Sequence, residues 1–338
     1  MKLYGGIDLH STNSYIVLID EEGNVLYKKR LANEVPLILS ELAKFDGIDS
    51  LVVESTYNWY WLADALISTG FHVKLANPNA IQQYSGLKYT DDKTDARWLA
   101  ELNRLNILPT GYIYPTETRH TRDLLRKRGQ LVRQHTQNLL SLQTNIERNA
   151  NLRLTSNQIK ALISEELQKI LKHEDIILAA NSNLMVMRSV NEQIKNIEKR
   201  VLARIRPNPS YLNLNTVPGI GPILSFTILL ETGEISRFKT VGDYVSYCRC
   251  VKSERFSNGK KKGENNQKNG NRYLCWAYVE AAHHAIRHYD EIKSYYQRKM
   301  KKTNNIVAIK TVAHKLARAC YHIIRDQEEF DMKKSFNC

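Results

Sequence analysis

The sequence predicts an α/β domain at the amino terminus, then a long helical middle segment and a mainly helical carboxyl-terminal part. Three observations support this prediction. Short apolar runs alternate with stretches of helical spacing at the start of the chain. Apolar residues then recur at heptad spacing. A turn rich in glycine and proline opens the last part. The predicted domains are 1–115, 116–208 and 209–330.

The first domain is predicted to open with an antiparallel meander of three strands. Polar turn residues separate its short apolar runs, as is typical of strands. Strands that alternate with helices after such a meander form a layered α/β fold with a mixed sheet. The predicted strands are 2–8, 15–19, 25–27, 51–53 and 72–75, and the predicted helices are 35–44, 59–68 and a stretch that begins at 91.

Four carboxylates are predicted to converge at one edge of this sheet. Asp8 and Glu54 each end a predicted strand, where ligands of open α/β sheets tend to bind. Asp92 and Asp95 lie in the first turn of a predicted helix and share a face. Oxygen ligands favour Mg²⁺ or Mn²⁺ over zinc, and two such ions assist phosphodiester displacement. Taken singly, each carboxylate also reads as a helix cap or a solvated charge.

The composition favours a polyanionic partner. The chain has 338 residues with 49 Lys and Arg against 35 Asp and Glu, a formal net charge of +14. Its five cysteines include no Cys-x-x-Cys pair, which is typical of a reduced compartment. We find no signal peptide and no apolar run near the roughly 20 residues of a membrane span. We therefore expect a cytoplasmic, nucleoid-associated protein without a membrane segment.

The middle segment has the spacing of paired helices. Leu125, Val132, Leu139 and Ile146 recur every seven residues. A second stripe at 187–201 follows the alternating three and four spacing of a coiled coil. Arg128 and His135 occupy positions where a second apolar stripe of this helix would lie. Two interpretations stay open: a face for RNA, DNA or another subunit, or an antiparallel helical hairpin packed on itself.

The segment Val217-Pro-Gly-Ile-Gly-Pro222 resembles a helix-hairpin-helix element that binds DNA phosphate without reading sequence. Gly219 and Gly221 would let the backbone approach the phosphate. The alternative is an ordinary helix start after a tight turn. We predict that residues 252–272, which are poor in apolar side chains, form a mobile loop.

This loop contains a candidate nucleophile among basic residues. The hydroxyl of Ser257 could attack phosphorus if a metal or base activates it. Ser253 is a competing candidate, and a solvated charged loop is the plain alternative. The predicted phosphate contacts are Lys260, Lys261, Lys262, Lys268 and Arg272.

Taken together, these motifs resemble the DEDD transposases of bacterial insertion sequences, a group that includes site-specific DNA invertases and bridge-RNA-guided recombinases. The likeness covers nearly the whole chain in the same order. The residues that carry it are Gly6-Ile-Asp8, Val53-Glu-Ser55, Asn77-Pro78, Asp92-Lys-Thr-Asp-Ala96, Pro218-Gly-Ile-Gly-Pro222, Ser257-Asn-Gly259 and Lys268-Asn-Gly-Asn-Arg-Tyr-Leu274.

The resemblance implies a ribonuclease H-like amino-terminal domain, similar to Holliday-junction resolvases, a coiled-coil segment and a carboxyl-terminal transposase domain. It implies that Asp8, Glu54, Asp92 and Asp95 hold Mg²⁺ while Ser257 forms a covalent phosphoserine intermediate with DNA. It further implies that the substrate is double-stranded DNA at the element ends and at the target, and that a structured guide RNA takes part. It also implies a dimer or tetramer in which two subunits together form each composite active site.

Three other classes of protein remain as alternatives. A metal-dependent nuclease of the Holliday-junction type would hydrolyse DNA with the same carboxylates and without a covalent serine. A non-catalytic nucleic-acid-binding protein would bind without strand transfer. A sugar kinase or actin-like ATPase also opens with a Gly-x-Asp strand, but it needs further glycine-rich phosphate loops, which we do not find in the sequence.

Overall fold

The computed structural model describes residues 1–81, 91–204, 208–264 and 269–336. The chain forms two compact units, Met1–Thr116 and Glu117–Cys338. The predicted division into three domains stays a prediction. No helix within the described ranges is both long and apolar enough to cross a membrane.

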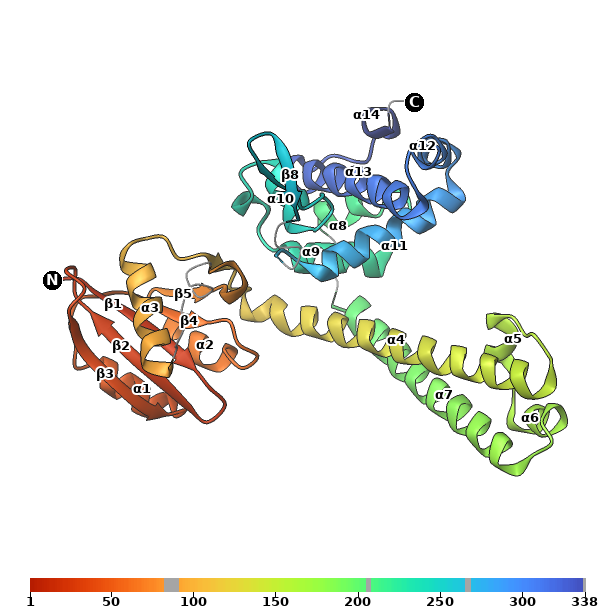
Figure 1. The fold of residues 1–338 in the computed structure, drawn as a ribbon, viewed down its shortest axis with the longest axis horizontal. Helices are drawn as coiled ribbons and strands as arrows, with labels where there is room; N and C mark the ends of the chain where they lie inside the picture. The colour runs from red at the N-terminus through yellow and green to blue at the C-terminus, as the bar shows by residue number, and fades with distance from the viewer. Residues whose placement is uncertain (82–90, 205–207, 265–268, 337–338) are drawn as a thin grey trace. The chain divides into compact units, whose positions relative to one another are not determined.

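The first unit contains a mixed six-stranded sheet with the order β3-β2-β1-β4-β5-β6 (Figure 1). The antiparallel β1–β2–β3 meander and the parallel β1–β4 and β4–β5 pairs confirm the predicted mixed α/β fold. The short edge strand β6 is an element that sequence patterning did not predict. The strands are β1 Leu3–Leu9, β2 Asn13–Ile19, β3 Val25–Ala32, β4 Ile48–Glu54, β5 Val73–Ala76 and β6 Thr110–Gly111.

Each face of the sheet packs on its own apolar cluster. Residues alternate between faces along a strand, so Ile7 and Leu9 of β1 point to the face covered by helices α1 and α2. The opposite face, to which Tyr4 points, packs against Ala96 and Ala100 of helix α3. The first unit's helices are α1 Val35–Leu42, α2 Tyr60–Ser68, the 3₁₀ turn η1 Pro78–Ala80 and α3 Asp92–Arg104.

Helix α3 approaches β1 closely because Gly6 has no side chain. A Cβ at Gly6 would lie 2.0 Å from the Ala96 carbonyl oxygen and 2.6 Å from the Ala100 amide nitrogen. Since Gly6, Asp8 and His10 are two residues apart, they project toward the same face of the sheet. The glycine therefore allows the start of α3 to come near Asp8.

The second unit begins with a helical hairpin. Helix α4, Thr116–Ala150, and helix α7, Glu174–Leu202, lie side by side in Figure 1, and the short helices α5, Ser156–Ala161, and α6, Ser164–Ile170, connect them. Arg128 donates two hydrogen bonds to Glu198 of α7, at 2.9 and 2.7 Å. A shared core of α4, α5, α6 and α7 residues closes the end of the hairpin. These contacts support the self-packed hairpin of the two interpretations of this segment.

The rest of the second unit is helical, as predicted. Its core contains Tyr244, Tyr278 and Tyr321, and the hydroxyl oxygens of Tyr244 and Tyr278 are 2.5 Å apart. The elements are α8 Pro209–Leu214, α9 Pro222–Thr232, η3 Ile235–Arg237, α10 Val241–Tyr247, α11 Arg272–His288, α12 Asp290–Met300, α13 Asn305–Asp326 and α14 Met332–Phe336.

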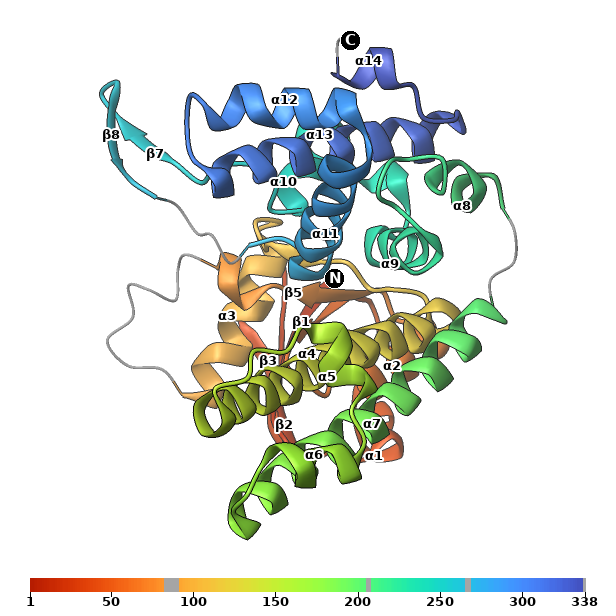
Figure 2. The same cartoon turned by 90° about the vertical axis from the view of Figure 1, so that its right-hand side faces the viewer.

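The prediction that 252–272 form a loop is wrong for the part around Ser257, whereas the predicted mobility stays a prediction. Residues Arg255–Ser257 form β7 and Lys260–Gly263 form β8, an antiparallel hairpin that projects from the neighbouring helices in Figure 2. Asn258 and Gly259 both have positive φ, 50° and 69°, as a two-residue hairpin turn requires. The Asn-Gly pair was the available signal, but polar strand residues obscured it.

Candidate active site

Strand pairing brings Asp8 and Glu54 together. In the parallel β1–β4 pair, Ile7 lies opposite Val53, so the next residue on each strand lies at the same end of the sheet. Burial, the charge of Asp8 and a hydrogen bond with Asp8 raise the pKa of Glu54 to about 7. This effect shows that Asp8 and Glu54 share one polar site.

Helix α3 adds Asp92 and Asp95 to this group. Its start is fixed by Asp91, whose Oδ1 accepts hydrogen bonds from the Thr94 amide at 2.8 Å and the Thr94 hydroxyl at 2.6 Å. Asp91 is therefore the helix cap, whereas Asp92 points toward Asp8. The pKa of Asp95 is raised by burial and by the charges of Asp91 and Asp92.

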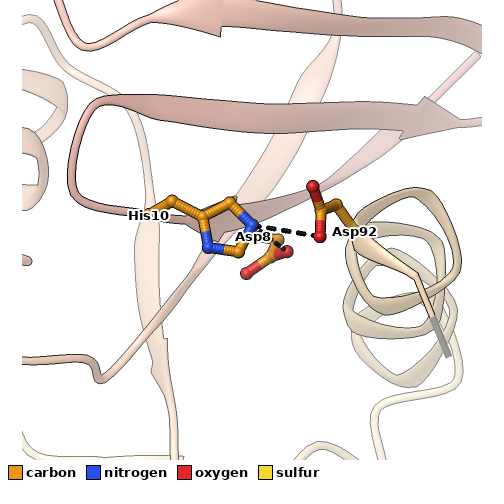
Figure 3. A group of neighbouring side chains, drawn as sticks. All are labelled: Asp8, His10 and Asp92. Atoms are coloured by element: carbon orange, nitrogen blue, oxygen red, sulfur yellow. Dashed lines mark ion pairs between the residues drawn. The ribbon is translucent and has the colours of Figure 1, made fainter.

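His10 is a further member that sequence reasoning missed. Its Nε2 lies 3.1 Å from Oδ2 of Asp8 and 3.2 Å from Oδ1 of Asp92, and Figure 3 shows this ring nitrogen facing both carboxylates. Within the described residues this buried nitrogen makes no well-directed hydrogen bond. The two-residue spacing from Asp8, which places both side chains on one strand face, was the available signal.

Two asparagines hold His10 in place. The His10 carbonyl accepts hydrogen bonds from Nδ2 of Asn33 at 2.9 Å and Nδ2 of Asn58 at 3.0 Å. Arg30 of β3 forms an ion pair with Asp92. The three-stranded meander, strand β4 and helix α3 therefore all contribute side chains to one site. These residues are far apart in the sequence.

Burial raises the pKa values of Asp8, Glu54 and Asp95 in this acidic group. The pKa of Asp8 is raised, chiefly by burial and also by the charges of Asp92 and Asp95, while the charge of His10 lowers it. Carboxylates this close repel one another unless a proton or a cation lies among them. One ligand atom each from Asp8, His10 and Asp92 lies within 4.8 Å of the others, so the donor set fits a divalent cation.

The other predicted site residues lie in the second unit. Ser257 and the lysines 260–262 are exposed on the β7–β8 hairpin, and Lys261 pairs with Glu254 at 3.0 Å. Ser253 precedes the hairpin and is half-buried. Arg272 is the exposed first residue of α11. Lys268 lies outside the described residues.

The two glycines of the Pro-Gly-Ile-Gly-Pro segment have different surroundings. Gly219 has a φ of +81°, and a Cβ there would lie 2.2 Å from the Ala281 carbonyl oxygen of α11. Its missing side chain therefore serves packing within the unit. Gly221 precedes α9, and a Cβ there would meet no atom within 4 Å. Gly221 is thus the glycine of this segment whose backbone has open space beside it.

Comparisons with known families agree with this geometry. A model of DEDD transposases of the IS110 type matches residues 5–148, and a model described as the transposase of the IS116/IS110/IS902 family matches residues 211–297. No curated protein matches the chain. Together the two matched ranges cover more than half of the chain and include the acidic site, β7–β8 and the whole of α11. The chain belongs to the IS110-type family of insertion-sequence transposases, enzymes that recombine DNA.

Proposed function

We propose that this transposase cuts and rejoins the DNA of an insertion sequence, with Asp8, Glu54, Asp92 and Asp95 as its metal-holding group and Ser257 as its nucleophile. The observation that carries the proposal is the convergence at one edge of the sheet of three carboxylates with raised pKa values, the buried Asp8 and the half-buried Glu54 and Asp95. Perturbed carboxylates in one group are typical of functional sites. A ribonuclease H-like fold for the first unit agrees with the mixed strand order.

The family implies a divalent metal, and we infer Mg²⁺ or Mn²⁺ because the ligands are mostly carboxylate oxygens. Such an ion stabilises charge on phosphoryl oxygens and orients the reacting groups. His10 either adds a nitrogen ligand or pairs with Asp8 and Asp92 to hold their orientation. Arg30 offsets part of the charge of Asp92.

Ser257 supplies the covalent step in this proposal. Its Oγ loses the hydroxyl proton and forms a bond to phosphorus, the bond from phosphorus to a deoxyribose oxygen breaks, and the released oxygen takes up one proton in exchange. Reversal of the step with a different DNA hydroxyl rejoins the strand and frees the serine. The exposed hairpin supports this role because double-stranded DNA can reach the hydroxyl, and the lysines beside it attract phosphate.

Three further features of the proposal rest on the resemblance to the family. A structured RNA pairs with donor and target DNA, so base pairing selects the sequence. The active enzyme is a dimer or tetramer. In it, the acidic group of one subunit and the serine of another form a composite site. Gly221 and Arg272 contact DNA phosphate from the starts of α9 and α11, which agrees with the open space at Gly221 and the exposure of Arg272.

The test is incubation of the full chain with element-end DNA, Mg²⁺ and RNA transcribed from the element's non-coding end. Denaturing electrophoresis and peptide mass mapping then locate any protein–DNA adduct. We expect an adduct on Ser257 that Ser257→Ala abolishes and that the neighbouring control Ser253→Ala retains. An adduct on Ser253 would refute the assigned nucleophile. Cut DNA without an adduct would establish hydrolysis by a junction-type nuclease, and binding without cutting would establish a non-catalytic protein.

A further inference from the structure

A cavity of about 270 Å³ lies within the second unit, between α4, α9 and α11. Its lining contains four arginine side chains and one carboxylate, together with the rings of Tyr273 and Trp276. This volume is just below the roughly 300 Å³ at which pockets for drug-sized ligands begin. The cavity therefore has room for about one planar ring system.

The lining of the cavity contains an ion pair between the half-buried Arg126 and the buried Glu231. Arg126 donates hydrogen bonds to both carboxylate oxygens of Glu231, at 2.6 and 2.7 Å, and its guanidinium lies 4.3 Å from the centre of the Tyr273 ring. Asn271 donates a further hydrogen bond to Glu231 at 2.7 Å and caps α11. Arg126 and the Tyr273 ring are thus held in place before any ligand arrives.

The mouth of the cavity combines charge with an exposed ring. Arg272 and Trp276 are four residues apart on α11 and share one face of the helix. Trp276 is 37% exposed, which is unusual for so large an apolar ring. Arg133 lies one turn beyond Gly129 on α4 and is also exposed. Cationic groups next to an accessible aromatic ring are the combination that binds the phosphate and base of a nucleotide.

Gly129 is an independent sign that this space is kept open. Glycine is among the least favourable residues in the interior of a helix, yet Gly129 lies inside the 35-residue helix α4. No close backbone contact explains it, because a Cβ there would meet only Arg133 Nη1, at 3.8 Å. Gly129 lines the cavity, so a larger side chain at this position would reduce the space.

We propose that this cavity binds one unpaired base of a nucleic-acid strand, with the base stacked on Trp276 and the adjoining phosphate bound by Arg272 and Arg133. The cavity lining shares no residue with the acidic group and does not include Ser257. The proposal concerns binding alone, so it can fail or stand whether or not Ser257 forms an adduct.

The first experiment measures the affinity of the full chain for a single-stranded 12-residue oligothymidylate and for the same oligonucleotide with abasic sites throughout. Because stacking on an aromatic ring contributes about 1–3 kcal/mol per base, Trp276→Ala should weaken binding of the base-containing strand about 5- to 150-fold. Binding of the abasic strand should not change. Equal weakening of the base-containing and abasic strands would overturn the proposal, and so would unchanged binding of both the deoxyribose strand and the matching ribose strand.

A second variant leaves every charge and ring in place. Gly129→Leu should weaken the base-containing strand by a comparable factor, because the added side chain fills the cavity. The control Gln130→Leu puts the same side chain on the exposed neighbouring position of α4, and it should bind like the unchanged protein. Wild-type affinity in Gly129→Leu would contradict the proposed site.

The same binding assay with RNA oligonucleotides shows whether the bound base comes from DNA or from RNA. If the deoxyribose strand responds to Trp276→Ala, the cavity takes a base from DNA, and if the ribose strand responds, it takes a base from RNA. A fully paired duplex should be insensitive to the variant, since its bases are not available for stacking. A duplex that loses affinity as strongly as the single strands would overturn the proposal.

Discussion

Asp8 lies on a strand that is buried along almost its whole length, whereas Ser257 lies on a two-stranded hairpin whose residues are all exposed. The acidic group is held by a six-stranded sheet, helix α3 and hydrogen bonds from Asn33 and Asn58. An isolated two-stranded hairpin is only marginally stable. Under the proposed function, the difference predicts a metal site that is arranged before substrate binds and a serine whose hairpin becomes ordered on DNA.

The electrostatics of the two regions differ in the same way. Burial raises the pKa values of Asp8, Glu54 and Asp95, because it disfavours the charged form of each carboxylate. The hairpin has no such burial, and its lysines are solvated. We therefore expect substitutions near Asp8 to change chemistry and folding, and substitutions on the hairpin to change mainly the interaction with DNA.

The largest expected effect comes from Asp92→Asn. A metal ion supplies several kcal/mol of charge stabilisation, so weakening its site should lower the rate of strand cutting about a thousandfold. The matched control is Asp91→Asn, one residue earlier, because asparagine caps a helix as well as aspartate does. We expect the control to cut at nearly the normal rate. Equal losses in the two variants would show that Asp92 has no special role.

A smaller but substantial effect is expected from Gly6→Ala. The added Cβ would collide with the Ala96 carbonyl, and such overpacking should destabilise the first unit by about 3 kcal/mol. Faster hydrogen exchange in β1 and α3 would report the loss. The matched control, Gly259→Ala, places alanine at a φ of +69°, which costs about 1–2 kcal/mol within the hairpin alone. Unchanged exchange in β1 of Gly6→Ala would contradict the close approach of α3.

The raised pKa of Glu54 gives a pH dependence to metal affinity. Its pKa is 4.5 in the unfolded chain and about 7 in the folded protein, so the bound proton stabilises the metal-free fold fully below pH 4.5. That contribution is lost as the pH rises through about 7. A metal must displace the same proton, so Mg²⁺ affinity should rise about tenfold per pH unit up to about pH 7 and then level off.

Titration calorimetry of the full chain at several pH values measures this dependence, and Glu54→Gln provides the comparison. The variant has no proton to displace at this position, so its weaker Mg²⁺ binding should change less over the same pH range. A slope in Glu54→Gln as steep as in the unchanged protein would assign the proton to another group.

The smallest expected effect is on the salt dependence of DNA binding. Replacing Lys260, Lys261 and Lys262 with glutamine should reduce the slope of log affinity against log salt by at most about 0.9 per lysine that contacts phosphate. Lys261 should contribute less than the others because it pairs with Glu254. Lys301→Gln with Lys302→Gln, both exposed elsewhere, serves as the control. Equal slopes of log affinity against log salt in the two variants would show that the hairpin lysines do not contact DNA phosphate.

Much of the fold was predictable because its signals are local. Apolar alternation located the strands from β1 to β5, and the acidic start at Asp91 located helix α3. Strand ends then indicated that Asp8 and Glu54 would lie close together, since parallel strands end at the same edge. The hairpin around Ser257 was missed, although Asn258-Gly259 is a strong turn signal, because polarity was interpreted as mobility.

The sequence by itself determined the alternation of strands and helices, the carboxylates at their ends and the basic charge of the chain. Tertiary structure alone decided that Arg30 meets Asp92, 62 residues away, that His10 lies between two carboxylates, and that Gly6 gives α3 its place. The physical reason is the distance along the chain over which each interaction acts. Periodicity and capping depend on neighbours in the chain, whereas a shared site depends on which distant surfaces pack together.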